Sequence, residues 1–120
     1  MALAYTVTLL ADHKGMTSPK AVGDEYVVDA LVDVSSVVAA GSVIPASAFG
    51  LSSIHAVVIT GNDNPNNSTN DIAIKAECSA TGLYESATSV AFMHTTMSSG
   101  TTLANDANGG SMRVRVWGNL

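Results

Sequence analysis

The sequence has 120 residues, which is the size of a single domain with one core. Only 12% of its residues are charged, about half the roughly 25% usual in soluble domains, whereas 47% are hydrophobic. Five basic against ten acidic residues give a net charge of −5, which would repel a phosphate backbone and argues against nucleic-acid binding.

The first part of the chain alternates apolar and polar residues with the two-residue period of strands. In residues 4–11, apolar side chains alternate with Thr6 and Thr8, which predicts a half-buried strand and not a signal peptide. Residues 13–24 contain glycines and a proline and are expected to form a loop. Residues 25–34 alternate again, and a helix would scatter their acids around its circumference, so a strand is preferred.

The middle of the chain combines a connection with a strongly apolar strand. Residues 35–53 are expected to be a connection, in which Pro45 ends any regular element and a single helical turn stops at Gly50. Residues 53–61 are nearly all apolar, which predicts a third strand that is central in its sheet and covered on both faces.

The Asn-rich loop at residues 62–71 is the clearest loop tip in the sequence. Its oxygen-bearing side chains could ligate calcium, but the spacing fails the EF-hand pattern, and Asn, Pro and Ser favour turns without any metal. These side chains belong to Asp63, Asn64, Asn66, Asn67 and Asp71. Whether the loop binds an ion or a partner stays open at this point.

The last third of the chain predicts three further pairing elements and a final strand. Residues 72–80 alternate with Lys75 and Glu77 outward, and residues 87–96 favour a strand over a short helix. An irregular segment follows, with a short pairing element expected around Thr101 to Leu103. The chain closes with a strand at residues 111–118.

These elements predict the fold class. Short strands separated by turn signals indicate an all-β, single-domain protein spanning residues 1–120, built as a two-layer β-sandwich or small barrel. We expect about 6–8 short strands and at most one short helical turn. No apolar run approaches the roughly 18 residues of a membrane span, so no membrane association is expected.

The histidines and the single cysteine give little sign of a metal site. His13, His55 and His94 are far apart and have no second ligand at zinc-site spacing. His55 alternates with apolar residues and is expected to be a histidine at the edge of the core with a hydrogen-bond partner. Cys78 lies in an alternating strand and predicts a buried, reduced thiol.

The acidic residues and serines give no catalytic pattern. Asp29 and Asp33 lie four residues apart on one strand, hence roughly 13 Å apart, beyond the about 5 to 9.5 Å of paired catalytic carboxylates. No nucleophile elbow and no Gly-rich phosphate loop occurs in the sequence. We therefore expect no enzymatic activity and no cofactor.

The final strand carries the most pointed pattern in the sequence. Met112, Val114 and Val116 share its core-facing side. The opposite side presents Arg113, Arg115 and Trp117. One hypothesis is an edge strand protected from aggregation by charge. The other is a subunit or capsid contact surface that faces acidic groups such as Asp29 and Asp33, within the fold or on a neighbouring subunit.

Three stretches resemble small virion proteins of tailed bacteriophages, of the kind encoded beside the major capsid protein. They are "AYTVTLL", "VDVSS…AGSVIPASAFGLSSIHAVVITG" and "GGSMRVRVWG". The resemblance is strongest to head decoration, or cement, proteins. It implies a β domain made in the host cytoplasm that binds the outer capsid surface of the virion. It also implies a homo-oligomer, trimer or dimer, that stabilises contacts between major capsid protein subunits, and it transfers no functional residue.

The composition is compatible with that role, because small, weakly polar surfaces pack against protein with few stranded charges. A secreted or simply low-charge domain would have the same composition. A phage neck, tail or fibre component is an alternative in the same setting, and a stand-alone glycan-binding β module is an alternative of another class. The latter normally presents exposed aromatic platforms, of which one Trp, three Tyr and two Phe offer few.

Overall fold

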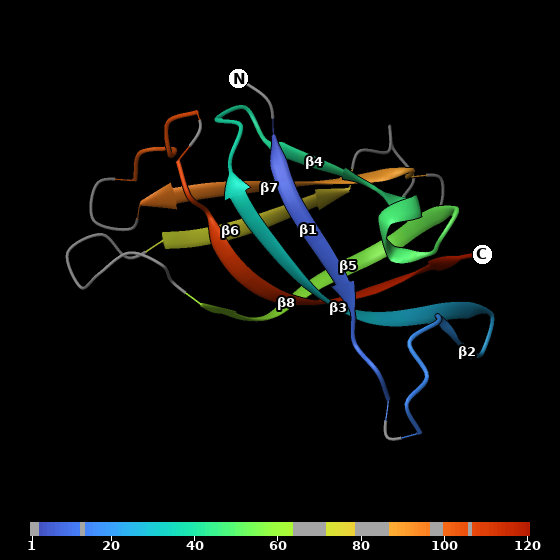
Figure 1. Ribbon diagram of the computed structural model, residues 1–120. Coiled ribbons are helices and arrows are strands. Elements are labelled where there is room, and N and C mark those ends of the chain that lie inside the picture. The colour runs from blue at the N-terminus through green and yellow to red at the C-terminus, as the bar shows by residue number, and fades with distance from the viewer. Residues whose placement is uncertain (1–2, 13, 64–71, 79–86, 97–99, 106) are drawn as a thin grey trace.

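Two antiparallel sheets face each other in the computed structural model of the chain (Figure 1). The structure describes residues 3–12, 14–63, 72–78, 87–96, 100–105 and 107–120. Its strands are β1 (Ala4–Leu9), β2 (Lys20–Val22), β3 (Glu25–Ser36), β4 (Ser42–Pro45), β5 (Ser53–Asp63), β6 (Ile72–Cys78), β7 (Ser89–Thr96) and β8 (Gly110–Asn119), with one 3-10 helix, η1 (Ala46–Phe49). The predicted all-β sandwich with a single helical turn is confirmed.

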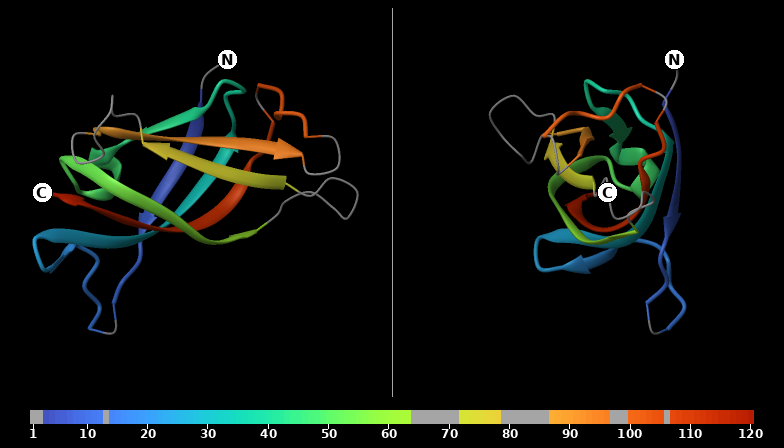
Figure 2. Two further views of the ribbon diagram at one scale, coloured as in Figure 1. Left: turned by 180° about the vertical axis from the view of Figure 1, so that it is seen from behind. Right: turned by 90° about the vertical axis from the view of Figure 1, so that its left-hand side faces the viewer.

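The larger sheet has the order β1-β3-β8-β5, with β2 also paired to β3. The smaller sheet has the order β4-β7-β6, and every strand pair in both sheets is antiparallel. A bridge between Ile54 and Ala87 joins the start of β5 to the segment that leads into β7. Figure 2 shows the two layers from behind and from the side.

The core lies between the sheets and is supplied by alternate residues, as the sequence pattern predicts. On β3 and β8 the inward side chains are almost completely buried, whereas their neighbours face outward. The inward set is Val28, Ala30, Val32, Val34, Met112, Val114 and Val116. Phe49 of η1 and Phe92 of β7 belong to the same cluster and are fully buried. Removing this apolar surface from water supplies the main driving force for folding.

The helical turn η1 ends as its sequence predicts. Gly50 has φ +78°, in the left-handed region that glycine adopts without strain, and its N–H donates to the carbonyls of the turn. Phe49 and Leu51 on either side of it anchor the crossover in the core.

The structure corrects two predictions about single segments. The segment expected to be only a connection contains β4 directly before the turn, where Pro45 ends a strand that pairs on one side with β7. The loop expected at residues 13–24 contains β2, whose three residues pair with the start of β3. Both strands are too short to show a period of their own.

The structure also corrects two predictions about strand position. The apolar strand β5 pairs with β8 on one side only, so it is an edge of the larger sheet, and Val58 on its outer face is 48% exposed. The strand β8 lies between β3 and β5, so the hypothesis of a charged edge strand is wrong. The pairing of Thr102 with Thr95 confirms the short element expected there.

An arm extends from the sandwich between β1 and β2. We use this name for residues 10–12 and 14–20, which leave the end of β1 and return along the start of β3 (Figures 1 and 2). The arm is held at its base by the Leu10 N–H, which donates to the Asp29 carbonyl at 2.8 Å. It therefore stands beside the outer face of the larger sheet at the position of Asp29.

Candidate protein-contact surface

The predicted contact residues lie together on the outer face of the larger sheet. In the register between β3 and β8, Asp29 is opposite Arg115 and Asp33 is opposite Ser111. Inward neighbours on both strands are buried, so these side chains project to the solvent side of the sheet. The outer face is thus the surface that the sequence pattern indicated.

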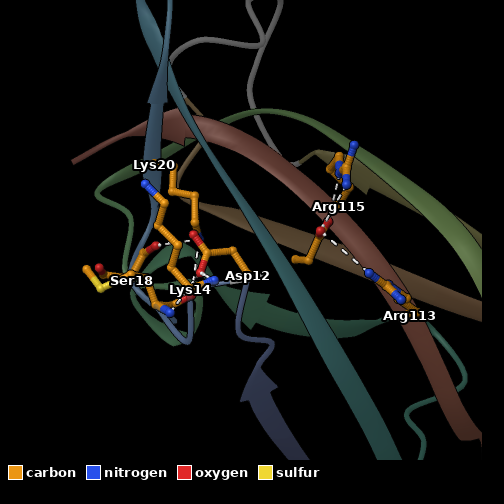
Figure 3. Close-up of polar contacts among 8 residues, drawn as sticks. Asp12, Lys14, Ser18, Lys20, Arg113 and Arg115 are labelled. Carbon is orange, nitrogen blue, oxygen red and sulfur yellow. Dashed lines mark hydrogen bonds and ion pairs between the residues drawn. The ribbon is translucent and has the colours of Figure 1, made fainter.

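One carboxylate serves both arginines. Arg115 donates from Nε to Asp29 Oδ1 at 2.7 Å and from Nη2 to Asp29 Oδ2 at 2.9 Å, a two-point pair (Figure 3). Arg113 approaches the same Oδ2 with its Nη2 at 3.6 Å. Hydrogen bonding from Arg115 lowers the pKa of Asp29, although partial burial of the carboxyl opposes that shift.

The structure does not bring every predicted residue into this cluster. Asp33 stands opposite Ser111, and within the described part of the chain it forms no ion pair. Trp117 is half-buried between Val27 and Ala56, its partners on the flanking strands. It closes one end of the face as an apolar side chain.

The exchange Asp29→Asn should cost little stability. The pair is solvent-exposed, with Arg115 48% and Asp29 24% accessible, and exposed pairs contribute about 0–1 kcal/mol. Folding lowers the pKa of Asp29 from its ordinary value of 3.8. The contribution of the ion pair to stability is therefore present above pH 3.8 and is lost as the pH falls below that value. Urea denaturation at neutral pH and in acid would show a small difference from wild type that vanishes in acid. A large loss at neutral pH would contradict a peripheral role.

The arm adds charged groups that sequence reasoning missed. Asp12 accepts hydrogen bonds from the backbone N–H groups of Lys14 at 2.8 Å and Met16 at 2.9 Å, which closes the turn at its tip. Lys20 places Nζ 3.7 Å from Asp12 Oδ2 and donates to the Met16 carbonyl at 3.2 Å (Figure 3). An Asp three residues before Gly15 is the signal that marks this turn in the sequence.

Two hollows flank the ion pair. One, of about 240 Å³, lies between the arm and the sheet and is lined by Asp12, Lys20, Asp29 and Arg115, among others. The second, of about 270 Å³, lies on the other side of the pair and is lined by Asp29, Thr60, Arg113 and Arg115. Both are small and have linings that mix polar and apolar groups, which suits single side chains of a partner better than a bulky ligand.

Exposed apolar side chains surround these charges. Leu31, opposite Arg113, is 40% exposed, and Val58, opposite Arg115, is 48% exposed. Met16 at the turn of the arm is 53% exposed. Arginines beside accessible apolar groups are the composition found at protein interfaces.

A separate gap lies between β5 and β6, beside His55. His55 Nδ1 lies 2.6 Å from Glu25 Oε2, which confirms the prediction of a hydrogen-bonded histidine. The gap, of about 470 Å³, is lined by His55 and by Cys78, which is a free, half-buried thiol. Burial raises the pKa of Cys78, so the thiolate needed for nucleophilic chemistry is disfavoured.

His94 is buried beneath the segment that precedes β8. Its side chain lies on the inner face of β7, and neither ring nitrogen has a hydrogen-bond partner among the described residues. Gly109 packs so closely on the ring that an added Cβ would lie 2.6 Å from Nε2. Burial lowers the pKa of His94 below its ordinary value of 6.5.

Stability should therefore fall in mild acid. The folded state favours the neutral ring of His94. The stability that depends on this neutral ring is therefore fully present above pH 6.5 and is lost as the pH falls below that value. Urea denaturation of wild type at a series of pH values between neutrality and mild acid would show this slope. The variant His94→Leu, which cannot titrate here, should have a flatter profile over the same range. Identical slopes would assign the pH dependence to other groups.

Within the described ranges no group of three or more His, Cys, Asp or Glu side chains could hold a metal ion. Residues 64–71 of the Asn-rich loop and His13 lie outside the described residues, so the predictions made for them are untested. Among the described elements there is no helix with the length and apolar character needed to cross a membrane.

Comparisons with models of known protein families, with curated proteins and with solved structures find no match to this chain.

Proposed function

We propose that the chain is a virion structural protein, a head decoration or cement subunit that binds the outer surface of a phage capsid and stabilises contacts between major capsid protein subunits. The phage setting rests on the resemblance of the three stretches described above. The observation that supports a contact role is the outer face of the larger sheet, where Arg113, Arg115 and Asp29 lie beside exposed Leu31 and Val58.

A cement subunit needs protein surfaces and no reaction chemistry. The edge strands and outer faces of a small β-sandwich supply several such surfaces around one core. Many identical weak contacts hold a lattice strongly when subunits are linked, and each bound copy stabilises the shell state that it prefers. The low charge of the chain reduces the number of ionic groups that binding must desolvate.

A mass-spectrometric copy count on purified particles tests this proposal. A decoration subunit is present in numbers comparable to the shell protein, whereas a neck or tail ring holds about a dozen copies by ring symmetry. Capsids that lack the protein should lose resistance to heat. Absence from purified particles would refute the virion role, and a count near a dozen would move the protein to the neck or tail.

The double variant Arg113→Ala, Arg115→Ala tests whether the outer face carries the contact. It should weaken binding to capsids from which the protein has been removed, measured by co-sedimentation. Lys75→Ala on β6 is the matched control, because Lys75 is an exposed cation paired with Glu77 on the other sheet. Equal binding of the double variant and the control would exclude the outer face as the contact.

A further inference from the structure

Most free strand edges of the two sheets are protected against pairing with another chain. A free edge presents unpaired N–H and C=O groups, and proteins protect it by shortness, by proline, by bulges or by charged side chains. The strands β2 and β4 have only three and four residues, and β4 ends at Pro45. The register of β5 is irregular at two places, and β6 carries Lys75 and Glu77. Each of these edges therefore has a recognised form of protection.

The strand β1 lacks these protections over most of its length. Its sequence, AYTVTL, contains no charged residue, no proline and no glycine, and it is rich in β-branched and aromatic side chains. Its register with β3 shifts between Ala4 and Tyr5 and is regular from there to Leu9. In the right-hand view of Figure 2, β1 lies at the margin of the molecule. It is therefore the edge best suited to accept another strand.

The backbone groups on the free edge of β1 follow from its pairing with β3. In an antiparallel pair, residues that bond to the partner strand alternate with residues whose N–H and C=O groups point away from it. The Leu10 N–H donates to the Asp29 carbonyl at 2.8 Å, so the two threonines of β1 also bond to β3. The N–H and C=O groups of Val7 and Leu9 then point to the free edge. Within the described part of the chain β1 pairs with β3 alone, so these groups have no strand partner.

The inner face of β1 indicates which side chains an added strand should carry on that side. Tyr5, Val7 and Leu9 pack against the core but are only half-buried at its margin. Directly opposite residues of an antiparallel pair share one face of the sheet. Apolar side chains at alternate positions of an added strand would therefore cover this surface and gain free energy.

The outer face of β1 favours a cation on the added strand. Thr6 is exposed and lies opposite Asp33 of β3. Asp33 is also exposed, and it forms no ion pair with any other described residue. An added residue opposite Thr6 would lie two strand spacings, about 10 Å, from Asp33. A lysine or arginine side chain is long enough to extend over the small threonine toward that carboxylate.

We propose that β1 is a strand-addition site for an extended segment of another protein. The segment pairs antiparallel to β1, with apolar side chains at alternate positions and a lysine or arginine between them. Main-chain hydrogen bonds supply the affinity of such a site, and the alternate side chains supply its specificity. The site does not depend on the virion setting, so its failure would leave the copy count in virions as an independent test of the cement role.

An NMR titration of the isotope-labelled, full-length chain gives the first test. The probe is the peptide Val-Thr-Val-Lys-Val-Thr-Val, blocked at both ends, and we expect a dissociation constant between about 10 μM and 1 mM. The amide signals of Val7 and Leu9 should shift most. Hydrogen exchange of these two amides should slow on binding, whereas the amides of Thr6 and Thr8, already bonded to β3, should change little.

Methylated peptides test the pairing without altering the protein. In the antiparallel arrangement the N–H groups of the inward valines face β1, and those of the threonines face away. N-methylation of the two valines that flank the lysine should abolish binding. N-methylation of the two threonines adds the same two methyl groups and should leave the affinity within about threefold of the parent peptide.

Val7→Pro removes one N–H from the free edge of β1 and should weaken peptide binding about tenfold. Val43→Pro is the matched control on the other sheet. There the Ala46 N–H donates to the Thr88 carbonyl at 2.8 Å, so by the same alternation the Val43 N–H points to the free edge of β4. Val43→Pro should bind like wild type, and circular dichroism verifies that both variants fold.

Asp33→Asn tests the charge preference. It should weaken binding of the lysine peptide about threefold, as expected for an exposed ion pair, and should not affect a peptide with norleucine in place of lysine. Glu77→Gln is the matched control, because it removes one exposed carboxylate from β6 of the smaller sheet. It should bind both peptides like wild type.

Three results would overturn the inference. The first is no binding of the parent peptide at about 1 mM. The second is equal binding of the two methylated peptides, which would show that contact does not use the backbone of the peptide. The third is protection of the Val7 and Leu9 amides that rises with protein concentration in the absence of peptide, because a second copy of the chain would then occupy β1.

Discussion

Replacing Gly118 with alanine should lower the free energy of unfolding by about 2–4 kcal/mol. Gly118 lies in β8 opposite Ile54, where β5 begins with an irregular register. A Cβ at this position would lie 1.9 Å from the Ser53 carbonyl oxygen and 3.0 Å from its carbon. These are backbone atoms, so no side-chain rotation can relieve the clash, and β5 must move away from β8.

Gly61 offers a matched control for this substitution. It lies in the same β5–β8 pair, its φ is not in the left-handed region, and a Cβ there would have no neighbour within 4 Å. Gly61→Ala should change stability by less than about 1 kcal/mol. Urea denaturation followed by the fluorescence of Trp117, the single tryptophan, measures both. Equal losses of stability in the two variants would show that β5 can move away from β8 at Ser53 with little cost in free energy.

The close packing of β5 against β8 at Gly118 also accounts for the pair that Trp117 forms with it in the sequence. Trp117 precedes this glycine, and its side chain covers the outer end of the face while the next residue lets β5 pack closely underneath. The terminal Trp-Gly pair of the sequence is thus explained by packing between β8 and β5, independently of any partner.

Alternation along the chain was sufficient to predict which side of a strand is buried. On β3 and β8 the alternation of apolar and polar residues is long and regular, so inward and outward residues could be assigned before their partner strands were known. Position within a sheet was a different matter. The apolar run of β5 suggested a central strand that is covered on both faces. In the structure, however, two of its apolar side chains, Ala56 and Val58, are exposed on the outer face. Conversely, the outer charges of β8 suggested an edge, yet a central strand tolerates them wherever one face of its sheet meets water.

The candidate site was predictable only in part for a related reason. The alternation of residues along each strand placed Asp29, Arg113 and Arg115 on outward faces. Only the register between β3 and β8 decides that Asp29 lies opposite Arg115 and that Asp33 lies opposite Ser111. The arm brings Lys20 to the same place through a turn closed by Asp12, a contact that no periodic pattern encodes. Long-range pairing, which the sequence does not specify locally, therefore assembled this surface.

Phe92→Ala should lower the free energy of unfolding by about 3–5 kcal/mol, the range for truncating a fully buried phenylalanine. Phe92 is 0% exposed and lies at the centre of the smaller sheet, paired with Ser42 of β4 and Ala76 of β6. It belongs to one cluster with Phe49 and the inward residues of β3 and β8, so its removal leaves a cavity between the two layers.

Val43→Ala is the control for Phe92→Ala, because Val43 lies on β4 of the same sheet and is 49% exposed. Its cost should stay below about 1 kcal/mol. Thermal and urea denaturation of both variants distinguish a shared core from two independently stable layers. If Phe92→Ala cost no more than Val43→Ala, the layers would not depend on a common core, and the larger sheet would have to hold the ion pairs of its outer face in place without support from the smaller one.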